Sequence, residues 1–208
     1  ERYTEVEEIL NSREDFINPV DNIELIDIDD IENVTGKIRD DWHLGESPIY
    51  SVIELLEYND VKILEIEAST DFDGLSSYVD NLYPVIVLNK NFSSERKRFT
   101  ALHELGHLIL KLPEGINDKL AEKYCDRFAG SLLLPKSIIE STLGNKRGRI
   151  SLNELKFLQE KYGISIPAIM YRLKDLRIIS ESNLKYFYIK QGQDINFKEL
   201  IMQDRYCL

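Results

Sequence analysis

Residues 98–108 of this chain read RFTALHELGHL, and the predicted fold rests mainly on the motif within this stretch. Within it, His103 and His107 stand four positions apart, so on a helix both side chains lie on the same face. Both imidazoles can then reach the same metal ion, which is the physical reason for the His-Glu-x-x-His spacing. Glu104 follows the first histidine and is the candidate general base toward an attacking water.

The residues around this motif indicate that its helix is buried. Apolar side chains surround it almost completely, at Phe99, Ala101, Leu102, Leu105 and Leu108. Two imidazoles in such a place need partners, because burying an unpaired polar group is costly. Two ordinary core histidines are the alternative, and we favour metal binding.

A third metal ligand is expected on the following predicted helix. Glu122 lies there, and Asp126 is one turn further along the same face. A Glu ligand completes the His₂Glu set of a catalytic zinc site and leaves the fourth position to water. Asp126 is placed to accept the second ring N–H of a ligand histidine. Glu114 and Asp118 are nearer in sequence but fall in the turn, so we favour Glu122 over both.

Patterns elsewhere predict a small sheet and several helices. β-Branched residues and partial alternation predict strands at 61–66, 74–79 and 83–88, joined by turns that contain Asp, Gly and Asn. We expect these three strands to form an antiparallel meander. Residues 23–34 fit either a strand or the start of an acidic helix. Capping and periodicity predict helices at 1–16, 31–42, 48–58, 93–111 and 118–134, and two helices within 151–179.

Composition excludes several classes of protein. The 208 residues are 43% hydrophobic and carry a formal charge of −11, which is typical of a folded chain that repels phosphate backbones. We therefore do not expect direct nucleic-acid binding. No bilayer-length apolar run or leader peptide is visible, and two cysteines make no disulfide scaffold, so we expect a cytoplasmic protein without a membrane partner. Because the chain begins with Glu1, we expect a trimmed N-terminus or a longer parent chain.

Three stretches together resemble the ImmA/IrrE family of metallopeptidases. The family pattern reads roughly RFTLAHELGHLLL, then E-x-x-A-N-x-F-A and LLMP, and the matching residues here are 98–108, 122–129 and 132–135. Further on, Ser165, Ala168 and Arg172 match an S-x-x-A-x-x-x-R pattern, and the resemblance covers about residues 38–180. Cys125 replaces the family's small Ala and Asp126 its common Asn, and neither change removes a ligand.

The resemblance implies an α+β, zincin-like metallopeptidase, with a small three-stranded antiparallel sheet packed with the HExxH helix and several further helices. It implies a zinc-dependent endopeptidase that holds one Zn²⁺ per chain, with His103, His107 and Glu122 as ligands and Glu104 as the catalytic base. Family members act on a partner transcriptional repressor and thereby switch on a mobile element or a stress response, so a repressor is the expected substrate. Tyr171 and Arg172 are possible oxyanion stabilisers by residue type. A non-enzymatic regulatory or DNA- or protein-binding module with the same fold is the alternative.

Charge is divided unevenly along the chain. Residues 1–35 hold twelve acids and two bases, whereas residues 136–190 hold eleven bases and five acids. A solvated acidic arm and a basic helical surface explain this difference, and a partner site at one end is the alternative. We expect an acidic N-terminal arm or linker at 1–35, a zinc peptidase core at 36–145 and a C-terminal helical segment at 146–208. Residues 155–176 mimic a helix-turn-helix spacing, but we favour a helical cover on the core.

Overall fold

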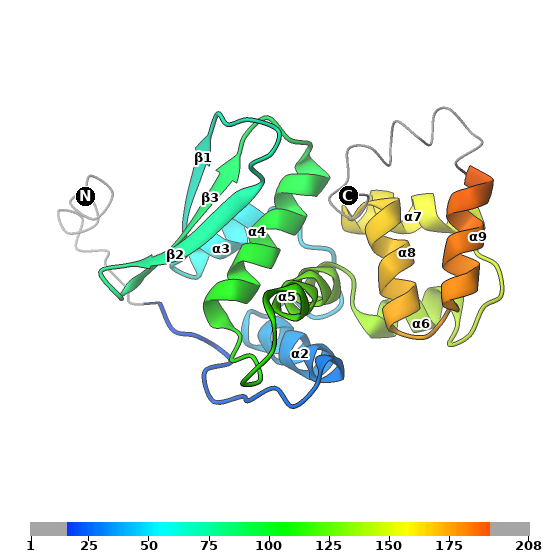
Figure 1. Ribbon diagram of the computed structural model, residues 1–208, viewed down its shortest axis with the longest axis horizontal. Coiled ribbons are helices and arrows are strands. Elements are labelled where there is room, and N and C mark those ends of the chain that lie inside the picture. The colour runs from blue at the N-terminus through cyan, green and yellow to red at the C-terminus, as the bar shows by residue number, and fades with distance from the viewer. Residues whose placement is uncertain (1–15, 192–208) are drawn as a thin grey trace.

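The computed structural model describes residues 16–191, which form eight α-helices, a short 3₁₀-helix and one three-stranded sheet. The sheet packs on one side of α4, α5 lies on the other side, and α7, α8 and α9 lie beyond α5 (Figure 1). Within the described residues, no helix is both long and apolar enough to cross a bilayer. The elements in chain order are η1 (Ile28–Asp30), α2 (Ile31–Asp41), α3 (Val52–Tyr58), β1 (Lys62–Ile66), β2 (Gly74–Val79), β3 (Tyr83–Asn89), α4 (Ser94–Ile109), α5 (Asp118–Leu133), α6 (Lys136–Leu143), α7 (Leu152–Tyr162), α8 (Ile166–Asp175) and α9 (Glu181–Gln191).

The α+β class is as predicted, but the sheet is mixed, so the expected antiparallel meander is wrong. Strand β3 is central; β2 pairs with it antiparallel and β1 pairs with it parallel. The β2–β3 hairpin is tight, and its turn places Asp80 and Asn81 at φ of 53° and 57°. The β1–β2 connection, by contrast, is a crossover that carries the chain past β3 to the opposite edge of the sheet.

The side chain of Asn89 holds this crossover in place. Its Nδ2 donates hydrogen bonds to the backbone oxygens of Ala68, Ser69 and Phe72, at 3.3, 2.8 and 2.9 Å. An amide at the end of β3 therefore satisfies carbonyl groups of a connection that has no regular structure of its own. Asp71, Asp73 and Gly74 are residues typical of turns, so the sequence predicted a turn between β1 and β2 and not a crossover.

Helix α4 begins where the sequence predicts and is as buried as expected. The Ser93 hydroxyl accepts a hydrogen bond from the backbone N–H of Arg96, which is an N-cap contact. On the α5 side, a Cβ added at Gly106 would lie 3.3 Å from both Cys125 and Phe128. Gly106 thus allows α5 to approach α4 closely, and this approach fixes the spacing between residues of the two helices.

The remaining elements differ from the predictions in a few places. Helix α3 begins at Val52, not at Pro48, because Ser51 is its N-cap and accepts from the N–H of Glu54. In the segment left open at 23–34, Glu24 forms an isolated bridge with Lys111 and helical structure starts at Ile28. Helices α6 and α9 were not predicted, and residues 1–15 of the predicted first helix lie outside the described part of the chain. Helix α2 spans the predicted boundary at residue 35. The division of the chain into an N-terminal arm, a core and a C-terminal segment, with its second boundary at residue 145, stays a prediction.

A buried ion pair joins α2 to α8. The Glu32 carboxylate accepts from both terminal nitrogens of Arg172, at 2.9 and 2.8 Å, and from the Ser131 hydroxyl of α5 at 3.0 Å. Arg172 also donates its Nε–H to the backbone oxygen of Leu134 at 2.6 Å. Burial alone would raise the pKa of Glu32, but the contacts with Arg172 and Ser131 outweigh it and lower that pKa below its usual range. This pair therefore fastens the C-terminal helices to the core.

Candidate metal centre

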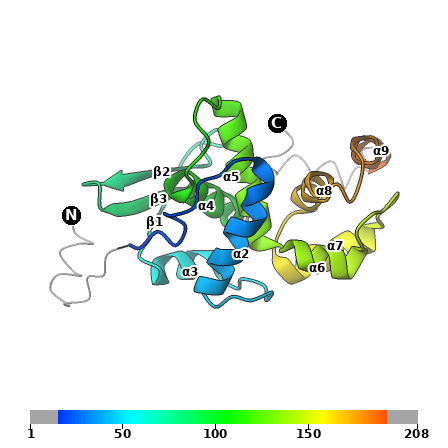
Figure 2. The same cartoon turned by 90° about the horizontal axis from the view of Figure 1, so that it is seen from below.

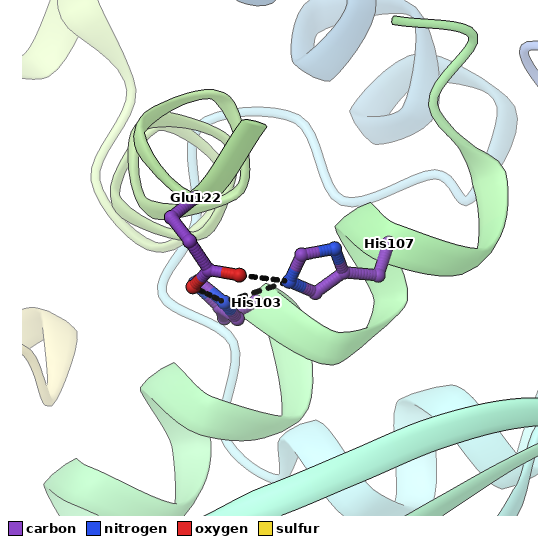
Figure 3. Close-up of side chains that lie close together, drawn as sticks. All are labelled: His103, His107 and Glu122. Atoms are coloured by element: carbon purple, nitrogen blue, oxygen red, sulfur yellow. Dashed lines mark hydrogen bonds and ion pairs between the residues drawn. The ribbon is translucent and has the colours of Figure 1, made fainter. Parts of the chain in front are cut away.

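Three side chains from two helices converge on one point between α4 and α5. His103 and His107 extend from α4 and Glu122 extends from α5 (Figure 3). The two Nε2 atoms lie 3.0 Å apart. The Glu122 carboxylate places one oxygen 3.2 Å from each of them. Among the described residues this is the group whose ligand atoms could hold a metal ion, and neither Glu114 nor Asp118 belongs to it.

The spacing of these atoms fits a tetrahedral zinc ion. Zinc bonds to His nitrogen and carboxylate oxygen are about 2.0–2.1 Å long, so two ligands of a tetrahedral ion stand roughly 3.3 Å apart. The observed separations of 3.0 and 3.2 Å are close to that value. Two imidazole nitrogens and two carboxylate oxygens facing one point also repel one another unless a cation or protons lie between them. The donor set therefore suits a divalent metal.

Asp126 controls the orientation of the first histidine. Its Oδ1 lies 2.8 Å from His103 Nδ1. A carboxylate is an acceptor, so the Nδ1 atom carries the hydrogen and the lone pair of a neutral imidazole is left on Nε2, toward Glu122 and His107. The i, i+4 spacing of Glu122 and Asp126 on α5 therefore brings both carboxylates to the same ring, from two sides.

Glu104 has a partner that the sequence analysis missed. Its carboxylate is largely buried, and Oε2 accepts a hydrogen bond of 2.8 Å from the hydroxyl of Ser76 on β2. Strand β2 lies against α4, and Ser76 points inward from it, so the contact links the sheet to the motif helix. No sequence rule joins two residues that stand 28 positions apart, although an inward serine on a predicted strand is a weak signal.

The two predicted oxyanion stabilisers have other contacts. The guanidinium of Arg172 is buried, and its three nitrogens donate to Glu32, Ser131 and the backbone oxygen of Leu134, so its hydrogen bonds are directed away from the candidate metal centre. The Tyr171 ring packs against Tyr188 of α9, with ring centroids 6.2 Å apart. Both residues lie on α8, but Glu32, the partner of Arg172, is 140 positions away in the sequence.

Comparison with known proteins assigns the chain to a family. The model of the Peptidase M78 family, described as an IrrE N-terminal-like domain, matches residues 56–174, which is more than half of the chain. The chain therefore belongs to this peptidase family, and the predicted ImmA/IrrE membership is confirmed. No curated protein matches the chain.

Solved structures provide one further comparison. A Mycobacterium tuberculosis transcriptional regulator is similar, with 12% identity and a TM-score of 0.49. The match covers 76% of this chain and 49% of that regulator, so the chain spans about half of the regulator's length.

Proposed function

We propose that this protein is a zinc-dependent endopeptidase, which hydrolyses a peptide bond in a protein substrate. The observation that carries the proposal is the convergence of His103, His107 and Glu122 on one point. Glu104 adjoins the first of these ligands and is held by Ser76, which supports its role as the base. Membership of a peptidase family adds to this support.

The residues of the chain would divide the chemistry as follows. His103, His107 and Glu122 would hold the zinc ion, which would supply Lewis acidity and make a water acidic enough to lose a proton near neutral pH. Glu104 accepts that proton and then delivers it to the nitrogen of the leaving amine. Ser76 keeps the Glu104 carboxylate in one orientation, and Asp126 keeps His103 in the tautomer that ligates.

The sheet edge indicates how a substrate would approach. Within the described residues β2 pairs with β3 alone, so the other edge of β2 has no partner strand. An extended peptide can add to such an edge through backbone hydrogen bonds. Ser76 of this strand contacts Glu104, so a peptide along β2 would pass the catalytic carboxylate. We propose a transcriptional repressor as the substrate, on the basis of the family resemblance.

The first test measures zinc in the purified protein. We expect about one zinc per chain, and a large loss in Glu122→Ala because one of three protein ligands is removed. Glu114→Ala is the matched control: Glu114 is exposed and was the rival ligand, and its removal leaves the cluster intact. Failure of the wild-type protein to bind zinc, or equal loss in both variants, would rule out the proposed site.

The second test separates an enzyme from a non-enzymatic module. Glu104→Gln keeps the three ligands and removes the base, so we expect full zinc content and about 10²–10⁴-fold slower cleavage. The same variant should retain a substrate long enough to be captured from host extract and identified. Cleavage of that captured protein by wild-type enzyme, followed by mass spectrometry, completes the test. Undiminished cleavage by Glu104→Gln would refute the mechanism, and an intact regulatory response without cleavage would favour the binding module.

A further inference from the structure

A second concave site lies among the C-terminal helices, apart from the candidate metal centre. It is a cleft of about 320 Å³ between residues 148–152 and helices α8 and α9, and it shares no lining residue with the metal centre. Figures 1 and 2 both place α8 and α9 on the far side of α5 from the sheet. Clefts that bind ligands have volumes of about 300–1,000 Å³, so this one holds a few side chains and not a large cofactor.

The floor of the cleft is apolar and its rim is basic. Met170, Ile179 and Phe187 form the floor and are buried in the core, whereas Arg149 and Lys190 line the rim and are exposed. Within residues 16–190, neither of these two cations forms an ion pair. A ligand that fits must therefore combine apolar groups with negative charge.

Two acidic side chains of the described residues lie on the neighbouring helices α7 and α9, and both have other partners. Glu154, in the first turn of α7, accepts from Arg147 at 2.9 Å and from the N–H and hydroxyl of its own N-cap, Ser151. Glu181, at the start of α9, pairs with Lys185 at 2.9 Å. Both carboxylates are thus engaged elsewhere, so among residues 16–190 no acidic side chain forms an ion pair with the exposed Arg149 or Lys190.

The apolar surface continues beyond the cleft along α9. Tyr186 lines the cleft and is 52% exposed, and Ile189, one helical turn further on, is 68% exposed. A ligand that covers both must be longer than the cleft, as a peptide segment is. Apolar side chains three or four positions apart on a helical ligand would match this spacing.

Nucleic acid is a poor match for the same surface. In a helix-turn-helix protein the second helix presents one face to the DNA groove, but seven of the ten residues of α8 are buried. An apolar floor also has nothing to offer a phosphate backbone, and the formal charge of −11 repels one. The resemblance of residues 155–176 to a DNA-reading motif is therefore one of spacing alone.

We propose that this cleft, lined by Met170, Ile179, Phe187, Arg149 and Lys190, binds an acidic amphipathic peptide segment of a partner protein. Apolar side chains of the segment enter the cleft and cover Tyr186 and Ile189, and its carboxylates pair with Arg149 and Lys190. The site recognises a partner without taking part in hydrolysis, so it does not depend on the proposed peptidase activity.

The test is a selection of random 12-residue peptides, displayed on phage, against the full chain. We expect enrichment of sequences that combine large apolar residues with at least two acids. A fluorescent copy of an enriched peptide should bind the wild-type protein, and Arg149→Glu with Lys190→Glu should weaken binding about tenfold or more, since 1.4 kcal/mol corresponds to tenfold. Tyr186→Ala should weaken it as well.

The matched control carries the same change of charge elsewhere. Lys119→Glu with Lys123→Glu reverses two exposed lysines of α5, and this double variant should keep the wild-type affinity. Unchanged thermal midpoints in all variants show that binding, not folding, is affected. No enriched peptide, enrichment without acids, or equal loss in both double variants would overturn the proposal. So would binding of a DNA duplex or of anionic lipid vesicles that depends on Arg149 and Lys190 while no peptide binds.

Discussion

Glu32→Gln should destabilise this protein strongly, although the residue touches none of the proposed metal ligands. The Arg172 side chain that Glu32 neutralises is 2% exposed, and Glu32 itself is 16% exposed. Removing one partner of a buried ion pair leaves an uncompensated charge and costs about 3–5 kcal/mol. Gln keeps one acceptor oxygen, so we expect about 3 kcal/mol. In a chain of this size that corresponds to a midpoint lowered by about 6–12 °C.

The dependence on pH distinguishes lost charge from lost packing. The pKa of Glu32 in the folded protein is lower than its ordinary value of 4.5. A carboxyl with a lowered pKa adds stability that is fully present above the unfolded value and is lost as pH falls through the folded value. The difference between wild type and Glu32→Gln should therefore be constant above about pH 4.5 and shrink in more acidic solution.

Urea unfolding across this pH range is the assay, with Glu57→Gln as the control. Glu57 is an exposed carboxylate of α3, so its substitution should change stability by less than about 0.5 kcal/mol. Adding Arg172→Met to Glu32→Gln should restore part of the loss, because the unpaired charge is gone. Equal stability of wild type and Glu32→Gln at neutral pH, or a difference that persists unchanged in acid, would show that the Glu32–Arg172 ion pair does not stabilise the fold.

Three further substitutions test the site itself. Gly106→Ala places a methyl group 3.3 Å from Cys125 and Phe128, so we expect the free energy of unfolding in urea to fall by about 1–3 kcal/mol. An unchanged free energy would mean that α5 can shift away from α4 at no cost. Asp126→Ala removes the partner of His103 Nδ1 and should lower the affinity for zinc about 10–100-fold, as measured by competition with a chelator. An unchanged affinity would contradict the proposed role of Asp126. Ser76→Ala should keep the full zinc content but lower kcat about tenfold, because the hydrogen bond to Glu104 is lost, and Ser76→Thr should restore kcat. A change in KM alone would instead assign Ser76 to substrate binding.

Helices were predictable where their signals are local. Ser93 caps α4, Ser151 and Ser165 cap α7 and α8, and Gly163 ends α7 with φ of 60°, all from residues within one turn of the boundary. The start of helix α3 was predicted wrongly because two serines, Ser47 and Ser51, offer the same capping signal, and the Ser51 hydroxyl is the one that accepts from the N–H of Glu54. Strand positions could also be predicted, since the alternation of apolar and polar residues indicates which face of a strand is buried. This alternation does not indicate the direction of the neighbouring strand.

The motif, its buried helix and the common helix face of Glu122 and Asp126 could be predicted because they depend on residue types at fixed helical spacing. The family could be predicted from the resemblance of three stretches of sequence to its pattern. Three features could not be predicted: β1 runs parallel to β3, Ser76 donates to Glu104, and Glu32 pairs with Arg172 across 140 positions. These outcomes differ because a helix repeats its own geometry within a few residues, whereas contacts between elements depend on packing over the whole chain. The convergence of His103, His107 and Glu122 could be predicted only in part. Helical periodicity indicates which residues share a helix face, whereas the close approach of α4 and α5 at Gly106 brings the two faces together.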